Sequence, residues 1–514
     1  MEKYLICNLI IMFIRFFYII PFILCLNAAE ITYSQVQIIS NNFIKNKIQN
    51  NSLYQIKSIN FINTKDDYVG IYIVHLNPVG FIIISGDDRA MPVLGYSFNN
   101  YIDLNNLPVQ LSPILDSYIE GIEYIVDNNI IIDQTNSQLL NYYLNENNIS
   151  RDDSRNVIPL ITANWSQGGG WNDFCPNNSV VGCVAVAMGQ VMYYWGHPNQ
   201  GDGYSQYYDP DHGIIAVNFE DYNYNYNNMF DDYPTEDSQL LLYHSGVAVH
   251  MNYSPWSSGA SVCWEGPSAQ NALDENFGYN DMITCEVKIN YTDEEWKILI
   301  EDQLDRGWPI VYRGYSDDAG HAWNIDGYED DYYHCNWGWG GSSNGYFYFD
   351  NLNAGGYNFI NNQAALLNII PDNLTEPFAL YEFIVDDLSV QFIDLSEMIN
   401  EDEIVHWEWD FGTGDFSYES SPQYIYSDYG SYDVTLRVMN NYGLYSSLHL
   451  ETITLVDLFG DLNGDNFINV IDIVQLVDYI LDNVIDQNLG LYDLNFDFQV
   501  NILDVILLVQ IIIN

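Results

Sequence analysis

The sequence predicts an α+β protein made of several domains, and three observations support this fold class. The chain has 514 residues, which is too long for one hydrophobic core. Apolar residues make up 48% of it, which is ample for globular folding. Between about 157 and 371, a half with helical spacing of apolar residues precedes a half that reads as strands.

The charge balance is strongly acidic. Lys and Arg total 14 against 70 Asp and Glu, a formal charge of −56. Such a surface repels nucleic-acid phosphates and anionic membranes, so we expect no nucleic-acid partner. It suits hard cations that take oxygen ligands, although most of the charge is expected to be solvated surface.

The N-terminus predicts a secretory signal peptide over 1–29. Lys3 precedes an apolar stretch that runs to Leu26, and the small residues Ala28 and Ala29 follow it. The alternative is an uncleaved anchor helix, but Arg15 interrupts the apolar run. We therefore expect a secreted or cell-surface protein with no membrane span after signal removal. The apolar tail from 500 to 513 is too short to cross a bilayer.

The cysteine count predicts at least one unpaired thiol. Cys7 and Cys25 leave with the signal, and five cysteines remain at 175, 183, 263, 285 and 335. Five is odd, and export favours disulfides. Cys183 is the candidate free thiol, and the pairing of the others stays open.

Residues 30–150 form the first predicted domain. Two apolar strands over 68–75 and 80–85 flank Pro78 and predict a hairpin, and a helix is expected over 111–126. The polar stretch 145–156 contains Arg151 and Arg155 in a chain poor in basic residues. It predicts an exposed linker that proteases can cut.

Residues 157–371 form the second predicted domain. Val184, Ala187, Met188, Val191 and Trp195 recur at helical spacing after Cys183. Strands are expected over 309–315, 322–328, 332–337 and 345–349. A helical half followed by a sheet half predicts two lobes with a cleft between them.

Cys183, His321 and Asn336 form the constellation that carries chemistry. A thiol, an imidazole and an amide together can run acyl transfer, and this order along the chain is typical of papain-like proteases. A helix start and an adjacent imidazolium would lower the pKa of Cys183. Gly182 would leave room for a substrate backbone, and the Cys183 amide would donate to the oxyanion. Taken alone, Cys183 would more often be a buried structural thiol, and the joint pattern overrides that reading.

The region 158–370 resembles the streptopain family of papain-fold cysteine peptidases. The matching stretches are 159–167, 181–190, 319–327 and 336–341. The resemblance implies that Cys183 is the nucleophile and His321 the general base and acid. It implies further that Gln167 is an oxyanion donor and that Asn336 and Trp337 orient and shield His321. The alternatives are a surface amide for Gln167 and core packing for Trp337 and Trp339. The stretch 251–261 resembles the family's mobile Gly/Ser loop near the cleft.

Two further resemblances extend the architecture. Residues 80–96 resemble the streptopain pro-domain, which inhibits its own protease, and this implies a zymogen cut in or near 145–157. The alternative is an accessory domain that is never removed. Residues 406–414 resemble the PKD signature, with Thr413 in place of the usual Asp, and imply an immunoglobulin-like sandwich over 376–457 that acts as a spacer.

A duplicated acidic loop predicts calcium binding over 458–514. Oxygen-bearing side chains fall at loop positions 1, 3, 5, 9 and 12, and position 7 would offer a backbone carbonyl. The resulting ligand sets are Asp461, Asn463, Asp465, Phe467, Asn469 and Asp472, then Asp493, Asn495, Asp497, Gln499, Asn501 and Asp504. The alternative is an acidic turn before an amphipathic helix, which the recurrence of the full spacing argues against.

The repeat resembles a dockerin, a small α-helical calcium-binding module, and implies a cohesin-like partner or cell-surface scaffold. Asn466 and Phe498 replace the usual Gly at position 6. Asn tolerates a positive φ, whereas Phe does so poorly. Calcium is expected to be structural, and catalysis needs no cofactor.

The sequence thus predicts a secreted cysteine endopeptidase made as a zymogen, acting on protein substrates and inhibited by its own pro-domain. The family resemblance suggests an apolar preference just upstream of the scissile residue. One alternative is a catalytically inactive adhesion or scaffold protein that uses the PKD and dockerin-like modules. Another is a peptide-transfer enzyme that uses the same thiol.

Overall fold

The structure is a computed structural model that divides into two compact units, 1–373 and 374–514. It describes residues 30–48, 53–109, 111–130, 134–145, 155–263, 266–315, 320–349, 361–398, 402–455, 459–465, 467–481 and 489–513. The predicted signal peptide and residues 146–154 of the predicted linker lie outside these ranges. In the described ranges, no helix has the length and apolarity needed to cross a bilayer.

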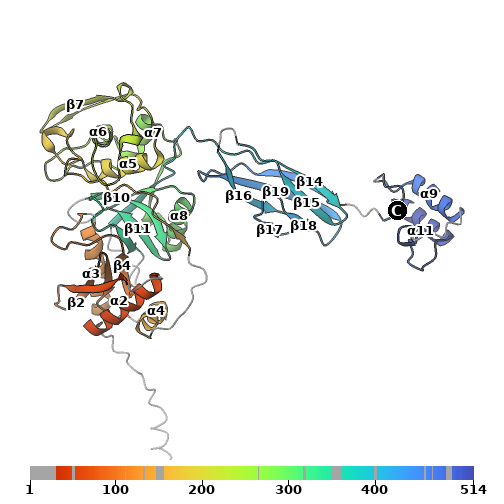
Figure 1. The fold of residues 1–514 in the computed structure, drawn as a ribbon, viewed down its shortest axis with the longest axis horizontal. Helices are drawn as coiled ribbons and strands as arrows, with labels where there is room; N and C mark the ends of the chain where they lie inside the picture. Colours follow the sequence, from red (N-terminus) through yellow and green to blue (C-terminus); the bar gives the residue numbers. More distant parts are fainter. Residues whose placement is uncertain are drawn as a thin grey trace, which may run out of the picture. The chain divides into compact units, whose positions relative to one another are not determined.

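A single large antiparallel sheet organises the first unit (Figure 1). Its order is β1-β2-β3-β4-β12-β11-β10-β9-β13-β8, and β5 pairs with β10 off this path. The strands are β1 (Gln55–Asn63), β2 (Val69–Asn77), β3 (Phe81–Ser85), β4 (Val93–Ser97), β5 (Asn156–Val157), β8 (Thr284–Val287), β9 (Ile310–Tyr315), β10 (Gly320–Glu329), β11 (Tyr332–Asn336), β12 (Gly345–Tyr348) and β13 (Asn361–Leu367).

Helices flank this sheet and build a separate lobe. The N-terminal region carries α2 (Tyr33–Lys47), α3 (Leu111–Asp127) and α4 (Gln134–Asn145), drawn in red to orange in Figure 1. The lobe contains α5 (Cys183–Trp195), α6 (Glu236–Ala248), α7 (Ala269–Phe277) and a hairpin of β6 (Tyr204–Asp209) and β7 (Gly213–Asn218). Four short 3₁₀ turns lie at Pro176–Asn178, Phe219–Asp221, Tyr226–Asn228 and Lys288–Asn290, and α8 (Asp293–Asp305) packs on β9 and β10.

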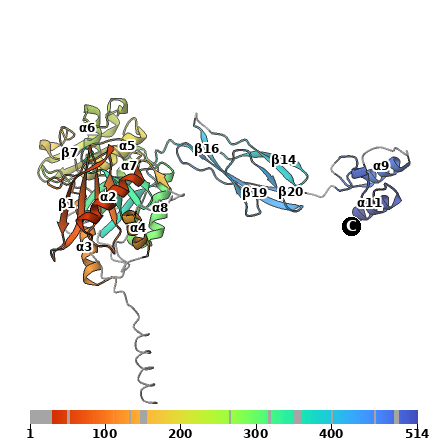
Figure 2. The same ribbon diagram turned by 60° about the horizontal axis from the view of Figure 1, so that its bottom comes forward.

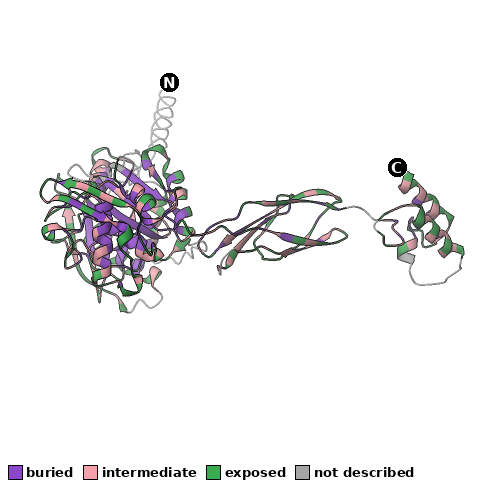
Figure 3. Cartoon of the chain, turned by 90° about the horizontal axis from the view of Figure 1, so that it is seen from above, coloured by how far each residue is buried: buried purple, intermediate pink, exposed green. Residues whose placement is uncertain are grey.

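Alternation along the central strands divides the buried residues between two cores. Figure 3 shows in purple how much of the first unit is buried. On β9, Ile310 and Tyr312 belong to one core, whereas Val311 belongs to the other. On β10, Trp323 and Ala322 divide in the same way. Successive side chains of a strand point to opposite faces, so each strand is buried on both sides. The sheet is therefore anchored between α5 on one face and α3 and α8 on the other.

The N-terminal region joins the rest of the first unit through backbone pairing and not only through side chains. β4 pairs with β12 in the registers Tyr346↔Tyr96 and Phe347↔Gly95. Tyr118 Oη donates to the carbonyls of Leu94 and Tyr348, both at 2.8 Å, and so bridges the two strands. A Cβ on Gly95 would lie 2.9 Å from Cδ1 of Phe347, so this position favours glycine. Figure 2 shows the N-terminal helices beside this continuous sheet.

The second unit holds a sandwich followed by a small helical module. One sheet has the order β14-β15-β18 and the other β17-β16-β19-β20, around a core that contains Tyr381, Phe392 and Trp409. The elements are β14 (Tyr381–Asp386), β15 (Ser389–Asp394), β16 (Ile404–Asp410), β17 (Phe416–Ser417), β18 (Gln423–Ile425), β19 (Gly430–Asn440), β20 (His449–Leu455), α9 (Val470–Leu481), α10 (Leu489–Tyr492) and α11 (Ile502–Ile513).

The structure confirms the α+β class, the helix after Cys183 and the four expected strands after residue 309. The expected hairpin is β2–β3, and the expected helix is α3. The sequence reading did not predict α2, β1, β4, β8 or β13, and it did not predict the shared sheet. The downstream end of the predicted linker is held in place, because β5 pairs with β10 and Arg155 Nη2 lies 2.9 Å from Asp305 Oδ2.

Candidate active site

Cys183 is the first residue of α5, directly after Gly182. The φ of Gly182 is 94°, in the left-handed region that favours glycine. A Cβ there would lie 2.6 Å from Sδ of Met251 and 3.3 Å from Cβ of Ser258. Gly182 is thus required by its backbone conformation and by packing against the 251–262 segment. The expectation that Gly182 also leaves room for a substrate backbone stays a prediction.

His321 lies near the start of β10 and lines the same cavity as Cys183. The cavity has a volume of about 680 Å³. Its lining comes from the loop before α5, the 256–262 segment, β9, the start of β10 and one N-terminal residue. The lining residues are Val109, Ser166, Gln167, Gly168, Gly169, Trp171, Val180, Cys183, Val184, Trp256, Ser257, Ser258, Gly259, Ala260, Val262, Arg313, Gly320, His321 and Trp339.

Both groups favour their neutral forms in this structure. Burial raises the pKa of Cys183, although the backbone amides of Ala322, Val184 and Cys183 itself oppose that rise. Burial lowers the pKa of His321. The expected depression of the Cys183 pKa is therefore wrong for the chain with its N-terminal region docked. Desolvation of the thiol outweighs the three backbone amides that would lower its pKa.

Gln167 lines the same cavity as Cys183. Its backbone carbonyl accepts from the Val181 amide at 2.9 Å, which ties this loop to the segment just before α5. Its neighbour Ser166 forms an antiparallel bridge with Trp339. The structure thus brings Gln167, Cys183 and His321 to one cavity, as the sequence predicted.

Asn336 and Trp337 have other partners in this conformation. Asn336 Oδ1 accepts from Gln190 Nε2 at 3.1 Å and from the Gly338 amide, and its Nδ2 donates to the Ala163 carbonyl. Trp337 is buried, and its Nε1 donates to the Ser343 carbonyl. Neither residue lines the cavity, and their roles toward His321 stay predictions.

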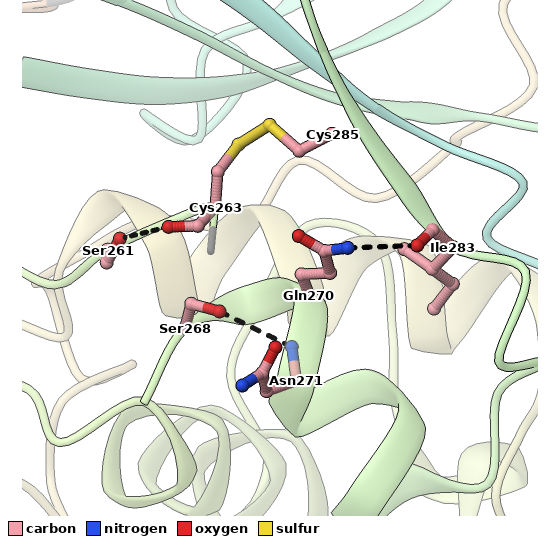
Figure 4. The surroundings of a disulfide bond; sticks show 7 residues. All are labelled: Ser261, Cys263, Ser268, Gln270, Asn271, Ile283 and Cys285. Atoms are coloured by element: carbon pink, nitrogen blue, oxygen red, sulfur yellow. Dashed lines mark hydrogen bonds between the residues drawn. A yellow bond between two sulfur atoms is a disulfide. The ribbon is translucent and has the colours of Figure 1, made fainter. Parts of the chain in front are cut away.

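The 251–262 segment forms one wall of the cavity. The backbones of Asn252 and Gly259 bond each other in both directions, at 2.9 and 3.2 Å. Ser258 Oγ donates to the Val180 carbonyl at 2.6 Å. A disulfide joins Cys263, just after this wall, to Cys285 on β8 (Figure 4). The glycine- and serine-rich composition had suggested only a flexible loop, whereas this wall is pinned at several points.

Among the described residues, three cysteines are free, where the odd count had required at least one. Cys183 is one of them, and the others are the buried Cys175 and Cys335. Burial raises the pKa of Cys175 to about 12. Cys335 belongs to the core on the side of the sheet facing α3 and α8. Cys183 is therefore the free thiol that opens onto the cavity.

The two C-terminal loops have matching geometry. Asp472 Oδ1 accepts hydrogen bonds from the Leu462 and Asn463 amides, and its Oδ2 accepts one from the Asn469 amide. Asp504, which lies 32 residues later (504 − 472), accepts the same three bonds from the amides of Leu494, Asn495 and Asn501. Phe498 adopts a φ of 65°, so the second loop takes the required conformation despite its side chain.

The donors in these loops fit a hard cation. Within the first loop, Asn463 Nδ2 lies 2.9 Å from Asp465 Oδ2, and Asn469 Nδ2 donates to the Phe467 carbonyl at 3.1 Å. Carboxylate, Asn and carbonyl oxygens are ligands that calcium accepts, and these are the donors that the loop contains. Among the described residues, no group of three or more His, Cys, Asp or Glu side chains is set to hold a metal ion.

Comparison with known proteins places this site in a family. Residues 165–347 match the Peptidase C10 family, and residues 28–122 match the Spi protease inhibitor family. The fold is similar to that of a Prevotella intermedia prointerpain A fragment, with a TM-score of 0.51 and 28% identity, covering 62% of this chain and 99% of that one. The chain contains a Peptidase C10 domain preceded by a Spi-type inhibitor domain, and it is similar to streptopain-like proteases. It is a cysteine endopeptidase with an inhibitory pro-domain.

Relatives in sequence agree with this assignment. Streptococcus pyogenes streptopain is 28% identical over 340 residues, which cover 59% of this chain and 81% of streptopain. The thiol protease/hemagglutinin PrtT of Porphyromonas gingivalis is 30% identical over 301 residues, covering 54% of this chain and 33% of PrtT. In the second unit, residues 381–451 match the PKD domain and 459–513 the dockerin type I domain.

Sequence reasoning singled out only part of the cavity wall. It allowed Trp339 both core packing and an active-site role, and Trp256 fell within the 251–261 stretch that resembles the loop near the cleft, but Arg313 and Val109 were not singled out. Trp256 is 92% exposed. Val109 comes from the pro-domain and is separated from Cys183 by 74 residues (183 − 109), so no local pattern could connect the two.

Proposed function

We propose that this chain is a secreted cysteine endopeptidase made as a zymogen, which hydrolyses peptide bonds of proteins through Cys183 and His321. The observation that carries the proposal is that both side chains line one cavity, at the junction of α5 and β10. Of the three free cysteines, the other two are buried, so Cys183 is the thiol available to substrate.

The proposed chemistry uses only this chain's residues. His321 takes the Cys183 proton, and the thiolate attacks the substrate carbonyl carbon. The Cys183 amide and the Gln167 side chain stabilise the oxyanion. The tetrahedral intermediate collapses as His321 protonates the leaving amine, and a thioester remains. Water, deprotonated by His321, then attacks the thioester, and Cys183 leaves to re-form the starting pair.

The docked pro-domain supports the zymogen proposal. Val109 occupies the wall of the cavity that contains the catalytic pair. The neutral forms of Cys183 and His321 agree with an inactive state, because the thiolate is the nucleophile. Removal of the pro-domain would expose the cavity and let water and substrate reach both groups.

The C-terminal repeat supports a calcium-dependent tether. Calcium would be held by the two ligand sets and would fix the loops against α9 and α11, with no part in catalysis. Each helix presents exposed aliphatic side chains at the same positions, namely Val470 and Ile471 on α9 and Ile502 and Leu503 on α11. We propose that these faces dock to a cohesin-like partner on a cell-surface scaffold.

Casein hydrolysis by the full chain, followed with intact-mass analysis, tests the proposal. We expect cleavage of the chain between 145 and 157, then casein hydrolysis that an epoxide thiol inhibitor abolishes. Cys183→Ala and His321→Ala should each remove both activities, whereas Cys175→Ala should keep them. Hydrolysis that survives Cys183→Ala would overturn the assignment. A folded, cleaved chain with no hydrolysis would favour the inactive scaffold protein.

A further inference from the structure

A hydrogen-bonded chain of three buried side chains lies next to the segment that leads into α5. Asp209 is the last residue of β6, and its side chain is fully buried. Its Oδ1 accepts from His212 Nδ1 at 2.9 Å, and His212 Nε2 lies 3.5 Å from Ser179 Oγ. The order of carboxylate, imidazole and hydroxyl is that of a Ser–His–Asp hydrolytic triad. None of these three side chains has a part in the proposed reaction.

Burial argues against Ser179 as a second nucleophile. Its exposed fraction is 0%, its amide donates to the Pro176 carbonyl, and its own carbonyl accepts from Asn172 Nδ2. A nucleophile has to come within contact distance of the substrate carbonyl carbon, which a fully buried hydroxyl cannot do. Ser179 is not among the described residues that line the cavity, whereas the next residue, Val180, is. The three side chains therefore act by holding structure in place.

Asp209 connects two segments that both contribute to the cavity. Through His212, its Oδ1 is linked to Ser179, at the start of the segment that leads into α5. Its Oδ2 accepts from the Tyr253 amide at 3.1 Å, within the 251–262 wall. The amides of Asp211 and His212 also donate to Oδ1, at 2.9 and 3.0 Å, and fix the carboxylate in the turn between β6 and β7. One buried carboxylate thus holds both segments.

This junction needs a carboxylate and not merely a side chain of that shape. Burial alone would raise the pKa of Asp209, but hydrogen bonds from Asp211, His212 and Tyr253 outweigh burial and lower it. The ionised carboxylate accepts hydrogen bonds at both oxygens. An asparagine has the same shape but only one accepting oxygen, so its NH2 group would face a donor on one side. Either the bond to the wall or the bonds to the turn would then be lost.

We infer that Asp209 and His212 are positioning residues, which hold the 251–262 wall against the segment 179–182 and so keep the cavity at the width that a peptide substrate requires. Two further bonds cross the same junction. The Val180 amide donates to the Ser254 carbonyl at 3.1 Å, and Ser258 Oγ donates to the Val180 carbonyl. Loss of the Asp209 contacts should therefore loosen the wall without unfolding the lobe. The inference deepens the proposed function and rests on it.

Steady-state kinetics of the full chain, activated by its own processing, tests the inference with internally quenched peptides. Asp209→Asn should raise KM by roughly 10-fold, the effect of one lost hydrogen bond to a buried carboxylate, and change kcat by less than about 3-fold. Alkylation of Cys183 by iodoacetamide should stay within about 2-fold of the parent rate, because this small reagent requires the thiol and not the wall. The matched control is Asp211→Asn, since the Asp211 side chain is exposed and its backbone amide is unchanged.

A double-mutant cycle tests whether the three side chains act as one unit. Ser179→Ala removes only a hydroxyl and should raise KM by about 3-fold. His212→Asn keeps a donor for Asp209 but does not reach Ser179, so it should match Ser179→Ala. In the Asp209→Asn background, Ser179→Ala should have no further effect, because the imidazole has already lost its anchor.

Several outcomes separate failure of this inference from failure of the proposed function. An unchanged KM in Asp209→Asn, with an active parent, overturns the inference alone. An equal rise in Asp211→Asn, additive effects in the cycle, or alkylation of Cys183 that slows as much as hydrolysis also overturns it. If Asp209→Asn does not fold, Ser179→Ala and His212→Asn decide, and an unchanged KM in both refutes the inference. Hydrolysis that persists without Cys183 but is lost in Ser179→Ala would make Ser179 the nucleophile and overturn both proposals. A parent that hydrolyses no peptide would overturn the proposed function and this inference with it.

Discussion

The Cys263–Cys285 disulfide offers the sharpest test of how the cavity wall is held. It joins residues 22 apart in sequence and ties the end of the 251–262 wall to β8. Both cysteines are buried, and Ser261 Oγ donates to the Cys263 carbonyl at 2.8 Å, so the bridge and the wall form one local structure (Figure 4). The double variant Cys263→Ser/Cys285→Ser removes the bridge and leaves two small polar side chains.

The expected loss of stability follows from the loop length. For a closed loop of 22 residues, the chain-entropy treatment gives about 3 kcal/mol at 25 °C. In a domain of this size, that corresponds to a fall in Tm of roughly 6 to 12 °C. Differential scanning calorimetry of the full chain, in a Cys183→Ala background that prevents self-digestion, measures the catalytic-domain transition.

Reductant provides an internal control. The parent should lose stability when reduced and then melt with the double variant, whereas the double variant should not respond. Because Gly259, Ala260 and Val262 line the cavity, we also expect a higher KM for peptides in the active double variant, with kcat little changed. If the double variant melts with the oxidised parent and reductant moves neither transition, the bridge does not hold the wall and this reasoning is refuted.

The remaining predictions concern protonation, loop conformation and pro-domain docking. Burial lowers the pKa of His244 to about 4 in the folded protein, whereas the pKa of a histidine in the unfolded chain is about 6.5. As the pH falls below about 6.5, the unfolded chain therefore takes up a proton that the folded protein does not. The folded protein loses up to about 3 kcal/mol of stability between pH 6.5 and 4. Urea titrations should show a flatter pH profile for His244→Asn, and an unchanged profile would contradict this. Because burial raises the pKa of Cys183, its alkylation in the uncut chain should be slow at neutral pH, and the alkylation rate should increase only in alkaline buffer. Intact-mass analysis measures this rate, and fast labelling at pH 6 would argue against a neutral thiol. Phe498 is exposed and has a φ of 65°, which is a strained backbone conformation for a phenylalanine. Phe498→Gly should therefore strengthen calcium binding by about 1 kcal/mol, as measured by titration calorimetry. The control variant Phe467→Gly should leave calcium binding unchanged. Gly95→Val should weaken the β4–β12 pairing, because the valine side chain would clash with Phe347. Activity should then appear sooner after cleavage than in the parent. An unchanged delay between cleavage and activity would show that the strand pair tolerates the valine.

Local periodicity predicted the elements that carry the catalytic groups. The helix after Cys183 and the strand that holds His321 both have strong apolar spacing and lie within single segments of sequence. β1 and α2 were missed because their patterns are weak. The burial pattern of β1 has no strict alternation, and α2 mixes buried polar residues such as Ser40 and Asn42 with its apolar ones.

Non-local features could not be predicted from the sequence. The shared sheet depends on a register between β4 and β12, which lie about 250 residues apart, and a register leaves no local signal. The disulfide was one of several possible pairings until Cys263 and Cys285 were placed 5.8 Å apart at Cα.

The way the pro-domain is held separates cleavage from activation. A cut between 145 and 157 removes the covalent connection but none of the contacts across the interface. The β4–β12 pairing, the Tyr118 bridge and the ion pairs of Lys47 with Glu329 and Asp330 all persist after such a cut. If the cut lies before Arg155, its ion pairs with Glu301 and Asp305 also persist on the catalytic side. We therefore propose that release of Val109 from the cavity requires dissociation of a paired strand, so that cutting of the chain would not by itself give substrate access to Cys183.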